Sequence, residues 1–555
     1  MNAKACLLKR PITVALAGFG FLLAAHSAHA ATYTVTNTND AGVGSLRDAI
    51  AQANTNPGAD TIVFSGVTGT IALASGALQI TDSVTITGPG AGSLSVSGNN
   101  VSGVFELSGS GTNVTTISDL SIVNGSASIG AGIVIGDGTT TLNRVRFANN
   151  AATSRGGAMA ADGFSMTLSI SDCTFSGNTA GKGGAIYIED TGPAVTISRS
   201  VFSGNTANEG GAIYLYDPDN NLTIDQSVFS NNSATVSGGA IHLYSFDAGT
   251  FTISNSVFSG NTAAKGGALY ADKLDLPMLV VNSTFTGNSA TAGGGGAMAT
   301  ARASGANLTI RETTIVGNTA TTNGGGTSFA GTATVTVVNT VIAGNTAPTS
   351  ADAGGVVGLS VSNSLIQTST AAITNNGGLL QNIAANIGAL AANGGPSVGA
   401  PGYTAVLQTM LPNAGSPLID AGTATGVLAT DQRGVGFPRI VGSAPDIGAA
   451  EYQTFQVTGL VTPVGGGTLV CAPNPVLRGQ SVICTATANP GYTFAGFSGD
   501  CSGLSCTLSN VTGNRTVSAR FNAVSPTVVP VFSGLHSLFM MGLIVLTAGL
   551  RGRRK

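Results

Sequence analysis

The residues best suited to chemistry in this sequence are tyrosines, a histidine and aspartates that recur at fixed offsets from pairs of glycines. The aromatic residues stand four or six positions after the first glycine of successive pairs, and the aspartates follow in the adjoining segment. The set is Tyr187, Tyr214, Tyr216, His242, Tyr244, Tyr270, Asp217, Asp219 and Asp247. Aromatic rings beside carboxylates suit stacking against a sugar and hydrogen bonding to it, and they also suit adhesive contact with a protein. We therefore predict that this set is an exposed ligand-binding face.

Three other interpretations of this face stay open. Aromatic side chains stacked on neighbouring strands stabilise a sheet without any ligand. We expect no metal and no cofactor on this face; Ca²⁺ bound by Asp217, Asp219 and Asp247 is the alternative. A polysaccharide lyase or glycoside hydrolase would need acids that converge with a base, and only Lys265 and Lys273 are near. The sequence therefore favours a binding protein without catalytic residues, with a lyase or hydrolase as the alternative.

A repeat of about 27 residues must position these side chains. The phrase Phe-Ser-Gly-Asn and its variants recur from Phe147 to Asn345, and Gly-Gly-Ala followed by an apolar residue comes about eight residues after most of them. A fixed period in this range indicates a solenoid, whose units bury their apolar faces by stacking on each other. Segments such as Val195–Ile197 alternate between apolar and polar residues and are rich in β-branched side chains. The units are therefore short strands and not helices.

Short strands stacked at about 4.8 Å per coil predict a right-handed parallel β-helix. Three strands with their turns use one period, so residues from about 60 to 385 allow roughly twelve coils. The asparagine that ends each phrase can donate to and accept from its equivalents above and below, which predicts an amide ladder. The glycine pairs suit tight corners, because no strand and helix flank them as in a phosphate-binding loop.

The two repeated phrases together resemble those of the chlamydial polymorphic outer-membrane proteins over about 200 residues. The resemblance implies a surface-exposed β-helical passenger with adhesin roles. The segment Tyr33–Phe64 also resembles the opening of many bacterial surface β-helices, in which Ser45–Ala53 would be a helix that plugs the first coil. We predict a cap with the first coils over residues 31–105 and the repeats over residues 106–390.

Residues 391–453 carry four phrases in the order and spacing of the family called choice-of-anchor Q. The phrases are Asn393–Pro396, Ser416–Gly422, Asp431–Gly434 and Asp446–Glu451. The resemblance implies a β-helical surface protein with one of several C-terminal anchors, and we predict that this segment forms the C-terminal coils. Its charged residues are expected to form a salt-bridge network that locks the last coil rather than an active site. They are Asp420, Asp431, Arg433, Asp446 and Glu451.

Residues 454–523 contain four of the six cysteines, namely Cys471, Cys484, Cys501 and Cys506. In an exported protein an even, clustered set indicates disulfides, with three connectivities available. Pairing Cys471 with Cys484 and Cys501 with Cys506 is favoured because it closes local hairpin loops. Zinc is the less favoured alternative, since no Cys-x-x-Cys pair or nearby His is present. The phrases Gly491–Phe494 and Phe497–Cys501 resemble the internalin B-repeat-like module, which implies a small β spacer.

Both ends of the chain carry targeting signals. Residues 1–30 combine a basic start, an apolar run and small residues, which predicts a signal peptide cut between Ala30 and Ala31. Residues 524–555 combine prolines, an apolar run long enough for one transmembrane helix and a basic end. This tail resembles the IPTL-CTERM and PEP-CTERM signals, which a membrane sorting enzyme processes; retention as a membrane anchor is the alternative. We therefore expect an exported protein of the cell envelope, the outer membrane or the cell surface.

The distribution of charge limits the partners. The formal net charge is −3, but basic residues gather at the two ends, so the body of the chain is more acidic than this number. An acidic body without a basic tract is a poor ligand for nucleic acid. The predicted partners are a glycan or a protein on a host or neighbouring cell, besides the export and membrane sorting machinery.

Overall fold

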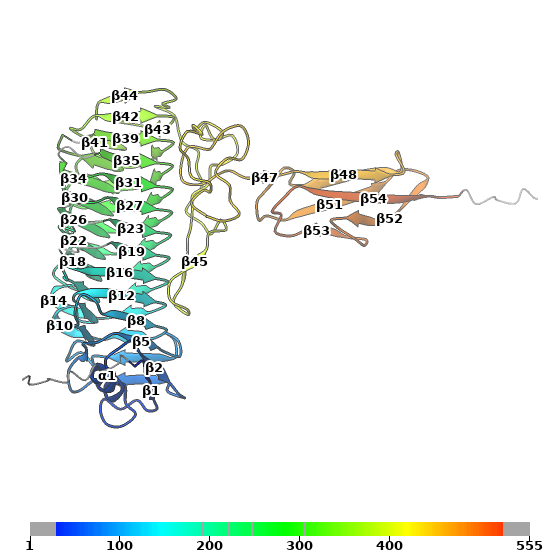
Figure 1. Cartoon of the computed structure of the whole chain (residues 1–555). Helices are drawn as coiled ribbons and strands as arrows, with labels where there is room; N and C mark the ends of the chain where they lie inside the picture. The colour runs from blue at the N-terminus through cyan, green and yellow to red at the C-terminus, as the bar shows by residue number, and fades with distance from the viewer. Residues whose placement is uncertain are drawn as a thin grey trace, which may run out of the picture. The chain divides into compact units, whose positions relative to one another are not determined.

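A computed structural model shows two compact units, Met1–Tyr452 and Gln453–Lys555 (Figure 1). The structure describes residues 29–189, 194–218, 221–245, 248–303, 307–332 and 334–525. The predicted signal peptide up to residue 28 and the predicted sorting tail from residue 526 lie outside these ranges. Within them, no helix has the length and apolar character needed to cross a membrane. The strands that dominate both units confirm the predicted all-β class.

The first unit is a parallel β-helix in which successive coils extend three long sheets, here called A, B and C, of 14, 12 and 11 strands (Figure 1). A short sheet D of five strands comes between B and C in the coils of the middle part. One coil consists of β19 (Val195–Ser198, sheet A), β20 (Val201–Ser203, sheet B), β21 (Thr206–Glu209, sheet D) and β22 (Ile213–Tyr216, sheet C). It pairs with β23 (Leu222–Asp225), β24 (Val228–Ser230), β25 (Ser233–Ser237) and β26 (Ile241–Ser245) of the next coil. The predicted parallel β-helix is confirmed, with a fourth strand per coil in its middle part that was not predicted.

A short helix covers the N-terminal end of the β-helix. α1 (Leu46–Thr55) lies between β1 (Thr32–Val35) and β2 (Asp60–Phe64), the first two strands of sheet A. The Ser45 hydroxyl accepts a hydrogen bond from the Asp48 backbone nitrogen at 3.2 Å, which caps the helix. One face of α1 is buried in the core of the first coils, and this confirms the predicted plug. The helix keeps water from apolar surface that an open solenoid end would expose.

Two ladders of buried side chains join neighbouring coils. In one, the rings of Phe147, Phe175, Phe202, Phe229, Phe258 and Phe285 stack almost parallel, with centroids 4.5–4.8 Å apart. In the other, each asparagine donates its backbone and side-chain N–H groups to the Oδ1 of the next, as Asn178 does to Asn205 at 3.0 and 2.9 Å. The ladder ends on Asp352, whose carboxylate accepts the same two bonds from Asn345. The predicted asparagine ladder is therefore confirmed.

The paired glycines form the corner that leads into sheet C, and each is required for a different reason. Gly210 has a φ of 62°, a left-handed conformation that costs glycine little. A Cβ on Gly211 would lie 2.1 Å from the carbonyl oxygen of Gly239 in the next coil. The corners predicted from the glycine pairs are confirmed.

Residues 391–453 do not form coils, and our prediction for them is wrong. Every residue of this segment is described, and it contains only two short antiparallel strands, β45 (Ser397–Val398) and β46 (Ala405–Val406). The segment runs along the outside of sheet B (Figure 1), where Gly399 N donates to Arg199 O at 2.8 Å and Gln432 Nε2 donates to Ser256 O at 3.1 Å. Its sequence lacks the alternation of apolar and polar residues that a strand buried on one face needs. We call it the returning segment.

Buried arginines and carboxyl groups hold the returning segment together. Arg433 Nε lies 3.0 Å from Asp431 Oδ2, and Arg439 Nε lies 3.6 Å from Glu451 Oε1. All four side chains are buried. Burial raises the pKa of Glu451 to about 8, because the loss of hydration outweighs the attraction of Arg439. The predicted salt-bridge network is present in part: Asp431 pairs with Arg433, whereas the carboxylates of Asp420 and Asp446 accept hydrogen bonds from backbone nitrogens. These contacts brace the returning segment and not a last coil.

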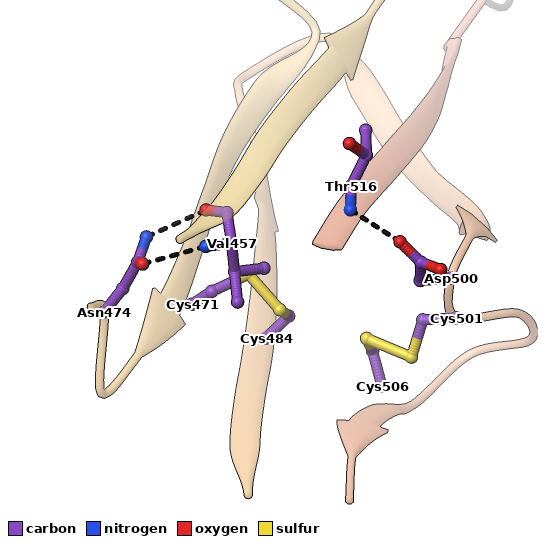
Figure 2. The surroundings of a disulfide bond; sticks show 8 residues. All are labelled: Val457, Cys471, Asn474, Cys484, Asp500, Cys501, Cys506 and Thr516. Carbon is purple, nitrogen blue, oxygen red and sulfur yellow. Dashed lines mark hydrogen bonds between the residues drawn. A yellow bond between two sulfur atoms is a disulfide. The ribbon is translucent and has the colours of Figure 1, made fainter. Parts of the chain in front are cut away.

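The second unit contains two three-stranded sheets. One joins β48 (Val457–Thr462), β54 (Arg515–Ala523) and β52 (Tyr492–Gly499), and the other joins β49 (Gly467–Ala472), β51 (Val482–Ala488) and β53 (Cys506–Leu508). The disulfides are Cys471–Cys484 and Cys501–Cys506 (Figure 2), which confirms the favoured pairing. The Asp500 carboxylate, next to the second disulfide, accepts a hydrogen bond from Thr516 N at 2.6 Å and so ties this loop to β54.

Candidate functional site

Four of the predicted site residues form one column on sheet C. Tyr187 in β18 (Ile186–Glu189), Tyr214 in β22, His242 in β26 and Tyr270 in β30 (Leu269–Leu274) are paired in register. The Tyr187 and Tyr214 rings stack 5.6 Å apart, and His242 lies 4.8 Å from Tyr214 and 5.2 Å from Tyr270 between ring centroids. The structure therefore brings the column together as the glycine offset predicted.

The column is not exposed, and that part of our prediction is wrong. The exposed fractions of Tyr187, Tyr214, His242 and Tyr270 are 4%, 0%, 3% and 8%. The charged side chain before one Gly-Gly corner lies over the ring that follows the corner of the next coil. Lys182 Nζ lies 4.7 Å from the Tyr214 ring centroid, and the guanidinium carbon of Arg155 lies 5.0 Å from that of Tyr187. These cation–π contacts make the column part of the fold.

Burial also removes the column from acid–base chemistry near neutral pH. It raises the pKa of Tyr187 to about 12 and the pKa of Tyr214 still further, because a phenolate would lose its hydration. It lowers the pKa of His242 to about 3, and the charge of Lys182 adds to this effect. His242 Nδ1 lies 2.9 Å from the Ser237 hydroxyl, so a neutral imidazole has a hydrogen-bond partner. These rings therefore stay neutral, and their contribution is packing.

Tyr216 and Tyr244 form the accessible edge of the aromatic set. Their rings stack with centroids 5.1 Å apart and planes 9° apart. Tyr244 is 38% exposed and Tyr216 is partly exposed. Lys182 Nζ lies 6.0 Å from the Tyr244 ring centroid, which places a cation beside this pair. Two stacked, accessible tyrosines offer an apolar platform with hydroxyl groups at its edge.

Lys182 also lines a groove of about 450 Å³. It is lined by Thr153, Ser154, Gly181, Lys182, Asn208, Glu209 and Val236. These residues come from four successive coils, so the groove extends about 14 Å along the axis of the β-helix. Lys182 Nζ and Glu209 Oε2 lie 3.5 Å apart within it. Hydroxyl, amide, ammonium and carboxylate groups thus face one open channel.

The sequence contains a pattern of charged residues, two of which line this groove, that our prediction missed. In four of five successive repeats the residue just before the glycine pair is charged, although only 8% of the chain is charged. These residues are Arg155, Lys182, Glu209 and Lys265. Their backbones pair from coil to coil in one row, in which Ser237 stands between Glu209 and Lys265. The predicted residues stand after the glycine corner, whereas these charged residues stand before it.

Only one of the three predicted aspartates lies among the described residues. Asp217 follows β22 with a φ of 49°, whereas Asp219 and Asp247 lie outside the described residues. Among the residues that are described, no three His, Cys, Asp or Glu side chains form a group that could hold a metal ion. The Ca²⁺ alternative therefore stays a prediction.

Two parts of the chain match known families. Residues 61–276 match the right-handed beta helix region. This match supports the predicted right-handed coiling of the β-helix. Residues 455–525 match the divergent InlB B-repeat domain, as the resemblance in the second unit implied. Comparison with curated proteins gives no match.

Two solved structures show a distant likeness in fold. Bacteriophage CBA120 tailspike protein 3 has 14% identity and a TM-score of 0.38 over 61% of this chain and 59% of its own. A mannuronic acid specific polysaccharide family 6 lyase from human gut microbiota has 10% identity and a TM-score of 0.34 over 62% of this chain and 83% of its own. The chain thus spans well under two thirds of the tailspike protein.

Proposed function

We propose that this protein is an exported, envelope-associated β-helix that binds an extended glycan. The ligand would lie in the groove at Lys182 and Glu209 and stack on Tyr216 and Tyr244. The observation that carries the proposal is the position of Lys182, which lines the polar groove and also lies beside the accessible tyrosine pair.

The chemistry of this region suits a sugar chain. A pyranose has an apolar face that packs on an aromatic ring and hydroxyl groups that both donate and accept hydrogen bonds. Glu209 supplies an acceptor, Lys182 supplies a donor, and Asn208 supplies both. The groove is open along the coils, so it fits a linear ligand better than a compact one.

Export is supported by other features of the chain. The predicted signal peptide and sorting tail would direct the chain to the cell envelope, where disulfides persist. The two disulfides of the second unit fit such an oxidising compartment. Adhesion through the bound glycan and anchoring by the tail complete the proposal.

A glycan array followed by calorimetry on the best ligand tests the binding site. The double variant Tyr216→Ser/Tyr244→Ser should weaken binding about tenfold or more, since two stacking surfaces are lost. Tyr33→Ser, which removes a partly buried tyrosine in β1 at the far end of the β-helix, is the matched control and should leave affinity unchanged. Equal affinity of the double variant and the wild type would refute this site. Release of reducing or unsaturated ends from the bound glycan would instead establish the lyase or hydrolase alternative.

A further inference from the structure

A buried carboxylate in the first coil meets the backbone nitrogen of Ala31. Asp60, the first residue of β2, is 1% exposed, and its Oδ1 accepts a hydrogen bond from Ala31 N at 2.7 Å. Asn56 Nδ2 donates to the same oxygen at 2.8 Å. In the part of the chain that the structure describes, Oδ2 has no hydrogen-bond partner and no cationic side chain pairs with this carboxylate. A buried carboxylate with so few partners is costly unless a positive charge compensates it.

We infer that the missing charge is the α-ammonium group of Ala31, which forms when the export peptidase cuts the chain between Ala30 and Ala31. This inference rests on the export proposed above. Hydrolysis of that peptide bond consumes one water molecule, leaves a carboxylate on Ala30 and leaves an amine on Ala31. The amine takes up a proton, since α-amino groups have a pKa of about 7.7–8.0. A neutral amide with one N–H thereby becomes a cation with three, already 2.7 Å from Asp60 Oδ1.

The position of Ala31 in the fold fits this role. Its carbonyl oxygen accepts a hydrogen bond from Thr61 N at 2.8 Å, so the pairing of β1 with β2 holds Ala31 next to Asp60. Ala31 is partly buried, whereas His29 and Ala30 are exposed. Cleavage would remove the bonds that His29 makes with Asn56 Nδ2 and Pro57 O. The hydrogen bond from Asn56 Nδ2 to Asp60 Oδ1 would remain.

The consequence is that the cap of the β-helix is completed by export. Before cleavage the first coil contains an uncompensated carboxylate, and after cleavage it contains an ion pair between β1 and β2. Because a solenoid is stabilised through its neighbours, the end coil is where an added pair has most effect. The mature amino terminus would thus be a structural part of the fold.

The first experiment compares the chain from residue 31 to 555 with the chain that starts two residues earlier at His29. An amine-selective acylating reagent at pH 7 labels the α-amine, and mass spectrometry of the N-terminal peptide gives the rate. The α-amine of the chain that begins at Ala31 should react at least tenfold more slowly than that of the chain that begins at His29. Equal rates would overturn the inference and leave the glycan groove untouched.

The second experiment removes the acceptor. Asp60→Asn in the chain from residue 31 should raise the labelling rate about tenfold, and Asp82→Asn should not. Asp82 is a matched control because its carboxylate accepts bonds from Gly58 N and Ser83 N in the same region but none from Ala31. If Asp60→Asn fails to fold, the test is the hydrogen exchange of the Tyr33 and Val35 amides, measured in the chains that begin at Ala31 and at His29 and that both keep Asp60. Exchange should be at least threefold slower in the chain from Ala31, and equal exchange would overturn the inference, as would an exported protein that begins at any other residue.

Discussion

The asparagine ladder allows a quantitative prediction at Asn205, which is fully buried between two coils. Asn205→Ala removes four hydrogen bonds: two from Asn178 to Oδ1, one from Nδ2 to Phe175 O and one from Nδ2 to Asn232 Oδ1. At about 1 kcal/mol for each bond, the free energy of unfolding should fall by about 4 kcal/mol. The backbone N–H of Asn178 would also lose the acceptor it uses inside the core, which adds to the cost.

Asn208 is the matched control for this experiment. It lies in the same coil, is exposed, and its side-chain oxygen accepts one long bond from Thr235 at 3.3 Å. Asn208→Ala should change the free energy of unfolding by less than about 0.5 kcal/mol. Urea unfolding followed by far-UV circular dichroism measures both variants. A loss of less than about 1 kcal/mol at Asn205 would refute the view that side-chain amides carry the stacking of coils.

Further predictions concern the corner, the disulfides and the returning segment. Gly211→Ala should abolish soluble expression, because its Cβ would lie 2.1 Å from Gly239 O, and backbone cannot move that far without separating coils. Replacing both Cys471 and Cys484 by serine should lower the stability of the second unit by about 3 kcal/mol in denaturant titrations, since the 13-residue separation closes a loop that restricts the unfolded chain. Stability of the first unit should fall as the pH rises from about 4.5 to about 8, because the unfolded chain releases the Glu451 proton near 4.5 and the folded chain holds it to about 8. Glu451→Gln should flatten this part of the pH profile of the melting temperature, and an unchanged slope would contradict the assignment.

The predicted aromatic column shows how far sequence reasoning reaches into the site. The offset of Tyr187, Tyr214, His242 and Tyr270 from the glycine pairs predicts their register, and the register is correct. Their exposure could not be predicted, because it depends on how Arg155 and Lys182 lie over the rings. The rule of alternation assigns an outward side chain to solvent, but here a charged side chain from the neighbouring coil covers the ring.

The repeating part of this protein could be predicted from its amino-acid sequence. Each coil pairs with the coil one period away, so residues such as Asn178 and Asn205 have to recur at that interval and their spacing can be read directly. The disulfide pairing could also be predicted, because each bond joins cysteines that are close along the chain.

The path of the returning segment and the stacking that forms the groove could be seen only in the folded chain. Gln432 contacts Ser256 across 176 residues, and no period links them. The groove at Lys182 exists because four coils present the residues before their corners side by side. Contacts between neighbours in a repeat leave a periodic trace in the sequence, whereas contacts made once, between distant and irregular segments, leave none.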